Sequence, residues 1–250
     1  MSLTGEGMRL AVLIDAENAQ LSILAELLAE VAKIGSATVK RVYGDFTNQG
    51  LAAWREPLLS NSILPIQQFR NTVHKNASDS ALIIDAMDLL HSGKFDGFCI
   101  VSSDSDFTRL ASRIREEGLL AFGFGEKQTP KSFVAACNRF IYTEILRKAP
   151  QEPSATGEST GPAEPKKHPG NLNELAPKLA SAVESCEDES GWALLSKVGK
   201  LLSNHQPDFD PRHYGFKNLS SLVKGMEQFD TEQRTEANVQ EFFVRLKQNV

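Results

Sequence analysis

The sequence predicts an α/β fold, in which a mostly parallel sheet is covered by helices on both faces and a smaller second unit follows it in the chain. Up to about residue 147, short continuous apolar segments alternate with segments of helical periodicity, as is typical of strand–helix–strand units. Two of the apolar segments are followed by acidic residues, one directly and the other after two serines. A proline-rich segment then separates this region from further amphipathic helices, which indicates a second domain.

In the first region, strands are expected where a short apolar segment is bounded by turn residues, and helices where apolar residues recur every three or four positions. The expected strands are 8–14, 38–43, 64–69, 98–101, 119–124 and 139–142. The expected helices are 19–34, 48–60, 79–91, 107–117 and 131–137. In the helix at 48–60, we expect four side chains to face inward: Leu51, Trp54, Leu58 and Leu59.

Acidic residues follow two of these strands and open one of the helices. The carboxyl ends of parallel strands meet at one edge of a sheet, and ligands bind along that edge in open α/β sheets. We therefore expect four carboxylates to lie together there: Asp15, Asp79, Asp104 and Asp106. Asp106 is also expected to cap the helix after it, and two capping residues in one turn are the alternative interpretation of an isolated Asp-x-Asp pattern.

Such a group of carboxylates suits a divalent metal ion. Crowded carboxylates repel one another, so they are stable together only with protons or cations present. Oxygen ligands without nearby clusters of His or Cys favour Mg²⁺ or Mn²⁺. We expect Asp15 and Asp104 to contact the metal directly. Asp85 lies roughly 120° from Asp79 around the predicted helix, which places it at the margin of the site or on a polar flank.

Three segments that carry these acids resemble the NYN domain, a branch of the PIN-like nucleases. They are Ile14-Asp15-Ala16-Glu17-Asn18, Asp79-Ser80-Ala81-Leu82-Ile83-Ile84-Asp85 and Val101-Ser102-Ser103-Asp104-Ser105-Asp106-Phe107. They occur in the family's order and spacing, and the resemblance covers residues 8–147. It implies a Rossmann-like three-layer core and a metal-dependent nuclease, with the same four aspartates as catalytic and metal-ligating residues.

Further residues are candidates for holding the substrate. Arg70 and Lys75 lie in a polar loop before the helix at 79–91 and would guide the RNA backbone. Asn18 would orient a phosphate or cap the helix that follows it. Ser103 stands where the resembling family often has Gly, and we include it among the residues expected to contact substrate.

The second unit is predicted to begin after a linker. Residues 148–171 contain five prolines and almost nothing apolar, which predicts a semi-extended linker. In 172–250, helices are expected at 172–185, 192–204 and 218–225, and short strands at 226–230 and 239–246. Three helices followed by a β-wing form a winged helix-turn-helix arrangement.

Part of this unit resembles the LOTUS (OST-HTH) domain, most distinctively in Tyr214-Gly215-Phe216-Lys217-Asn218-Leu219 and also in 192–202 and 209–213. Members of that family bind RNA or, in some proteins, a protein partner. Residues 192–224 carry a net charge of +3, from two aspartates and five basic residues: Lys197, Lys200, Arg212, Lys217 and Lys224. Such a face can bind phosphates, although we expect Tyr214 and Phe216 to belong to the core rather than to stack on bases.

Composition narrows the protein class. A net charge of −5 over 250 residues argues against a uniformly basic nucleic-acid-binding protein. Three widely spaced cysteines form neither a metal-ligand motif nor a disulfide framework, which favours a reducing cytoplasm. Residues 1–7 are polar, unlike a signal peptide, and no segment has the length and hydrophobicity of a membrane span.

Two other functions compete with a nuclease. Asp104-Ser105-Asp106-Phe107-Thr108 also fits the D-x-D-x-T motif of aspartate-based phosphatases, but that fold needs further acidic and lysine motifs downstream, where little of the domain remains. The more serious alternative is a non-catalytic RNA-binding protein with a vestigial site. We expect a metal-dependent ribonuclease, with DNA as an alternative substrate. Residues 1–148, with 16 basic and 17 acidic residues, would bind RNA weakly without the C-terminal domain.

Overall fold

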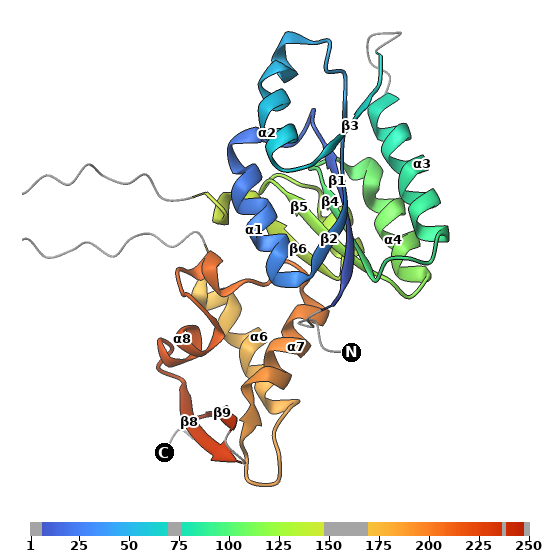
Figure 1. Ribbon diagram of the computed structural model, residues 1–250. Helices are drawn as coiled ribbons and strands as arrows, with labels where there is room; N and C mark the ends of the chain where they lie inside the picture. Colours follow the sequence, from blue (N-terminus) through green and yellow to red (C-terminus); the bar gives the residue numbers. More distant parts are fainter. Residues whose placement is uncertain (1–6, 70–76, 148–169, 237–238, 248–250) are drawn as a thin grey trace, which may run out of the picture. The chain divides into compact units, whose positions relative to one another are not determined.

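The computed structural model describes residues 7–69, 77–147, 170–236 and 239–247 (Figure 1). The chain divides into two compact units, Met1–Arg147 and Lys148–Val250, which are described separately below. Arg70, Lys75 and almost all of the predicted linker lie outside the described residues. No helix in the described ranges is long and apolar enough to cross a membrane.

The first unit contains a six-stranded sheet in which every neighbouring pair is parallel, in the order β3-β2-β1-β4-β5-β6. The strands are β1 (Arg9–Asp15), β2 (Ser36–Gly44), β3 (Leu64–Gln67), β4 (Gly97–Val101), β5 (Leu120–Gly125) and β6 (Arg139–Tyr142). The chain proceeds outward from β1 through β2 to β3, and then outward from β4 in the other direction. The strand order therefore reverses between β1 and β4, and this switch point is where open α/β sheets bind ligands.

Helices cover both faces of the sheet, as Figure 1 shows, so the predicted three-layer α/β fold is confirmed. One apolar core joins the sheet to α1 (Leu24–Ile34) and α2 (Arg55–Ser60). The other core joins the sheet to α3 (Ala77–His91), α4 (Thr108–Glu116) and α5 (Lys131–Ala136). Alternate residues of β1 contribute to the two cores, which explains why the strand is apolar throughout.

Several predicted helices differ from the observed ones. The predicted helix at 19–34 begins only with a 3-10 turn, Leu21–Ile23, and the first half of 48–60 is the 3-10 helix Gln49–Trp54. The prediction that Leu59 faces inward is wrong, because its side chain is 76% exposed. In α2, Leu58 enters the core, and the next side chain projects about 100° away around the helix.

The second unit combines three helices with a small antiparallel sheet. The helices are α6 (Leu172–Glu184), α7 (Leu195–His205) and α8 (Leu219–Lys224), and the strands, in sheet order, are β7 (Ala193–Leu194), β9 (Val239–Leu246) and β8 (Phe229–Glu236). The predicted helix at 192–204 is therefore wrong at its start, since Ala193 and Leu194 pair with Val244 and Phe243. The strand predicted at 226–230 begins later and runs to Glu236.

Candidate active site

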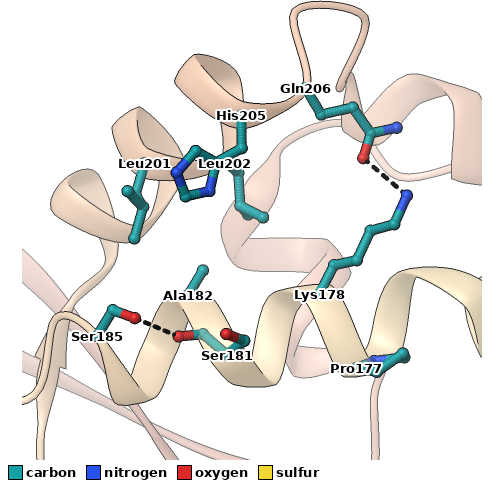
Figure 2. Close-up of a pocket in the computed structure, with 9 residues that line it drawn as sticks. All are labelled: Pro177, Lys178, Ser181, Ala182, Ser185, Leu201, Leu202, His205 and Gln206. Carbon is teal, nitrogen blue, oxygen red and sulfur yellow. Dashed lines mark hydrogen bonds between the residues drawn. The ribbon is translucent and has the colours of Figure 1, made fainter.

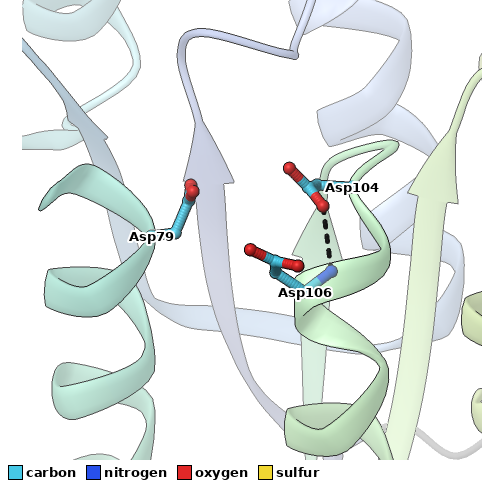
Figure 3. A group of neighbouring side chains, drawn as sticks. All are labelled: Asp79, Asp104 and Asp106. Atoms are coloured by element: carbon cyan, nitrogen blue, oxygen red, sulfur yellow. Dashed lines mark hydrogen bonds between the residues drawn. The ribbon is translucent and has the colours of Figure 1, made fainter. Parts of the chain in front are cut away.

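Three of the four predicted aspartates lie together at the switch point of the sheet. Asp79 is in the first turn of α3, and Asp104 and Asp106 follow β4, the latter in the 3-10 turn η3 (Ser105–Phe107). One carboxylate oxygen from each residue lies within 4.8 Å of those of the other two. Figure 3 shows Asp79 facing the other two side chains across the gap between α3 and η3.

The electrostatics of this aspartate trio (Asp79, Asp104 and Asp106) oppose full ionisation. Burial raises the pKa of Asp79 to about 7, with further contributions from the negative charges of Asp15, Asp104, Glu17 and Asp106. Among the described residues, neither Asp79 nor Asp104 forms an ion pair with a lysine or arginine. A divalent cation would relieve this repulsion, and three carboxylates suit a hard ion such as Mg²⁺ or Mn²⁺.

Asp15 is a buried carboxylate close to the aspartate trio, and both of its oxygens accept hydrogen bonds. Its side chain is 1% exposed. Oδ1 accepts a hydrogen bond from the Glu17 amide at 3.0 Å, and Oδ2 accepts from Asn18 Nδ2 at 2.6 Å and from Ser102 Oγ at 2.9 Å. Burial raises the pKa of Asp15, and these hydrogen bonds act against that rise. Asp15 thus adds negative charge to the site, while direct contact with a metal stays a prediction.

Ser102 connects the two strands that carry the site, although the sequence did not single it out. Its Oγ donates to Asp15 at the end of β1 and accepts from the backbone amide of Asp104 at 3.1 Å. The residue is buried, so this hydroxyl holds the loop after β4 against β1. Ser103 has a related role in the same loop, since its Oγ accepts from the Glu126 amide after β5 at 2.8 Å. The position of Ser102, directly between a buried strand and an acidic turn, was the sequence feature that could have indicated this role.

Two capping predictions are wrong. Asp104, not Asp106, caps the turn after β4, because its Oδ1 accepts from the Asp106 amide at 2.9 Å. A 3-10 turn precedes α4, which moves the capping position toward β4. Asn18 does not cap the following helix either, since its amide donates to Asp15 and that turn begins later, at Leu21.

Asp85 lies on the polar flank of α3 and not in the aspartate trio. It forms an ion pair with Arg41 of β2, with 2.7 Å between Oδ2 and Nη1, and accepts a hydrogen bond from the Tyr43 hydroxyl at 3.0 Å. Glu17, whose direction the sequence left open, points toward α3, where its Oε1 accepts from Ser78 Oγ at 3.2 Å. Glu17 therefore contributes negative charge beside Asp79.

In the second unit, four of the five predicted cations are exposed: Lys197, Lys200, Lys217 and Lys224. Arg212 differs, because its guanidinium is held by the buried Asp210, with 2.7 Å between Nη2 and Oδ2. Tyr214 and Phe216 are partly buried and pack against the core. This unit also has a hollow of about 470 Å³ between α6 and α7, where Lys178, Ser181, His205 and Gln206 lie around Leu201 and Leu202 (Figure 2).

The chain matches two family models, one in each of its compact units. Residues 9–146 match the NYN domain, and residues 170–239 match the OST-HTH/LOTUS domain. No curated protein matches the chain. The solved structures that it resembles include a protein of unknown function from Vibrio parahaemolyticus, at 17% identity over 54% of this chain and 91% of that one, with a TM-score of 0.44.

Two NMR structures are also similar. An uncharacterized protein from Nitrosomonas europaea is 29% identical over 40% of this chain and 95% of that one, with a TM-score of 0.30. A protein from Chromobacterium violaceum is 31% identical over 35% of this chain and 91% of that one, with a TM-score of 0.27. The NYN match spans more than half of the sequence and coincides with the parallel-sheet unit that carries the aspartates. The chain therefore belongs to the NYN domain family and carries a C-terminal OST-HTH/LOTUS domain.

Proposed function

We propose that the protein is a divalent-metal-dependent ribonuclease that hydrolyses phosphodiester bonds. The convergence of Asp79, Asp104 and Asp106 at the switch point of a nuclease-like fold carries this proposal. Phosphodiester hydrolysis needs a nucleophilic water and neutralisation of the phosphate charge. The raised pKa of Asp79 supports the same conclusion. It reflects burial and the negative charges of neighbouring carboxylates, which a bound cation would balance.

Each residue has a definite part in this proposal. Asp79, Asp104 and Asp106 would hold Mg²⁺ or Mn²⁺, and Asp15 is the fourth candidate ligand, whose negative charge acts on Asp79. When bound, such an ion supplies positive charge to the phosphate and lowers the pKa of water at the site. Ser102 fixes the Asp104 backbone relative to the Asp15 carboxylate through its two hydrogen bonds. Asn18, Ser103, Arg70 and Lys75 would contact the substrate.

The OST-HTH/LOTUS domain would supply RNA affinity. Its exposed lysines can contact phosphates, whereas the nuclease unit is nearly neutral in charge. Arg212 contributes less to this surface than predicted, because Asp210 neutralises it. Three free cysteines, two of them buried, fit a reducing cytoplasm.

Cleavage of single-stranded RNA tests the proposal. The purified full chain is expected to cut an end-labelled RNA in Mg²⁺ or Mn²⁺ and to lose this activity in EDTA, since the carboxylates alone offer no positive charge. Labelled DNA of the same sequence, assayed in parallel, distinguishes the alternative substrate. Binding of RNA without cleavage in either metal would contradict the nuclease and support a non-catalytic RNA-binding protein.

A further inference from the structure

The OST-HTH/LOTUS domain contains a second open pocket, of about 500 Å³, formed by α7, the start of α8 and the start of β9. This size lies within the range of pockets that hold small organic groups. The residues that matter below are Ser196 and Gly199 of α7, Asn218 and Leu219 at α8, and Gln240 and Phe242 of β9. We refer to it as the β9 pocket.

The walls of the β9 pocket combine aromatic, aliphatic and uncommitted polar groups. Phe242 is partly buried and Leu219 packs beside it against the core. Ser196 and Gln240 are exposed, and their side chains make no hydrogen bond to any other residue in the described parts of the chain. Gly199 has no side chain, which lets Leu219 lie close to α7. A Cβ atom at this position would be 3.0 Å from Leu219 Cδ2. An aromatic wall with free donors and acceptors suits a flat heterocycle.

One lysine lies beside an aromatic residue of this pocket, and three others are neighbours in sequence of residues that line it. Lys224 places its Nζ 5.1 Å from the centroid of the Phe242 ring. Lys197, Lys200 and Lys217 each adjoin, in sequence, a residue that lines the pocket. All four are exposed, and none forms an ion pair with another described residue. Glu241 is the charged residue among those lining the pocket, so positive charge at this site comes from exposed lysines of the same domain and not from the lining itself.

We propose that the β9 pocket binds one unstacked base of single-stranded RNA, while Lys224 and other exposed lysines of the domain hold the adjoining phosphates; this inference rests on the proposed RNA-binding role of the domain. A nucleotide carries a planar base and an anionic phosphate, which match Phe242 and the lysines respectively. Bases inside a duplex are stacked and paired, so the pocket selects single strands. The ammonium group of Lys224 beside the Phe242 ring favours this occupant over an apolar peptide.

RNA binding by pocket-filling variants tests the proposal. Binding of a fluorescent single-stranded RNA to the full chain is measured in EDTA, which prevents metal-dependent cleavage. Ser196→Phe fills the β9 pocket from an exposed position of α7, and the matched control Ser181→Phe fills the hollow between α6 and α7 shown in Figure 2. Loss of one base contact is expected to weaken binding about tenfold in Ser196→Phe. Ser181→Phe should bind like the wild type.

Salt dependence and crosslinking supply independent readouts. Ser196→Phe should keep the wild-type slope of affinity against salt concentration, because it removes no phosphate contact, whereas Lys224→Ala should reduce that slope. RNA carrying 4-thiouracil is expected to crosslink within 240–242 on irradiation. Gln240→Ala is a smaller change at an exposed residue and should also weaken RNA binding. It therefore tests the pocket independently if Ser196→Phe disturbs folding.

The outcomes separate this inference from the nuclease proposal. If both Ser196→Phe and Gln240→Ala bind RNA with wild-type affinity, the proposal that the β9 pocket binds a base is overturned. A protein partner would then be the occupant to test. Failure of the wild type to bind single-stranded RNA in EDTA would overturn it as well. Absence of metal-dependent cleavage, with pocket-dependent binding intact, would instead overturn the nuclease proposal alone.

Discussion

Asp79→Asn is expected to abolish metal-dependent cleavage and, at the same time, to raise the stability of the metal-free protein. The variant removes a metal-binding carboxylate, so we expect cleavage to fall about a hundredfold or more. It also removes a partly buried charge that lies beside the carboxylates of Asp15, Glu17, Asp104 and Asp106. After allowance for solvent screening, the relief of this repulsion at neutral pH is on the order of 1–2 kcal/mol.

The pH dependence of stability follows from the same residue. Folded Asp79 keeps its proton up to about pH 7, whereas the unfolded residue loses its proton near 3.8. The folded state therefore binds more protons between these values, and the free energy of unfolding of the metal-free wild type falls as pH rises through this window. Asn does not titrate, so Asp79→Asn should lack this fall. Protons compete with metal for Asp79, so metal binding should strengthen as pH rises through about 7.

Thermal unfolding in EDTA, measured across this pH range, checks the prediction. Asp88→Asn is a matched control, because Asp88 lies exposed on the same helix and outside the aspartate trio. The control should unfold and cleave like the wild type. An unfolding temperature that drops in Asp79→Asn at neutral pH would show that Asp79 stabilises the metal-free fold, contrary to its raised pKa.

Asp15→Asn is expected to lose cleavage, as Asp79→Asn does. Its stability is expected to fall, whereas that of Asp79→Asn is expected to rise. Both oxygens of Asp15 accept hydrogen bonds from N–H or O–H donors at a position that is almost fully buried. An amide nitrogen in either position would face a donor, at a cost of about 1–3 kcal/mol of unfolding free energy. Misplacement of the Ser102 hydroxyl would also move Asp104, whose amide it binds.

Unfolding in EDTA and cleavage in Mn²⁺, measured on the same preparations, test this pair of effects. Ser102→Ala gives a graded comparison, because it removes one hydrogen bond to Asp15 and leaves the carboxylate itself in place. It should lower stability less than Asp15→Asn and reduce cleavage about tenfold through the displaced Asp104. Wild-type stability in Asp15→Asn would mean that the hydrogen-bonded network at the end of β1 does not hold the site.

The sheet and the location of the site were predictable because their causes are local. Strands β1 and β4 are buried on both faces and therefore read as continuous apolar segments. Their order in the chain then placed Asp15, Asp104 and Asp106 at one edge of the sheet. The same reasoning could not place individual oxygens, and it selected Asp15 as a direct metal contact without indicating that this residue is almost fully buried.

The remaining features depend on partners that are distant in sequence. Ser102 reaches Asp15 across 87 positions, and Ser78 reaches Glu17 across 61, so no short motif reveals either hydrogen bond. The 3-10 turns before α1 and α4 were missed because side-chain periodicity over a single turn does not distinguish them from an α-helix. Strand β7 contains only Ala193 and Leu194 and exists because β9 pairs with it.

The most direct measurement of the central claim is cleavage of labelled single-stranded RNA by the wild type, Asp104→Asn and Asp88→Asn in Mg²⁺, in Mn²⁺ and in EDTA. Asparagine at position 104 keeps the side-chain oxygen that caps η3, so the variant should fold while losing a carboxylate of the trio. We predict metal-dependent cleavage by the wild type and Asp88→Asn and a loss of about a hundredfold or more in Asp104→Asn. Equal cleavage by Asp104→Asn and the wild type would contradict a nuclease site at the carboxyl end of β4.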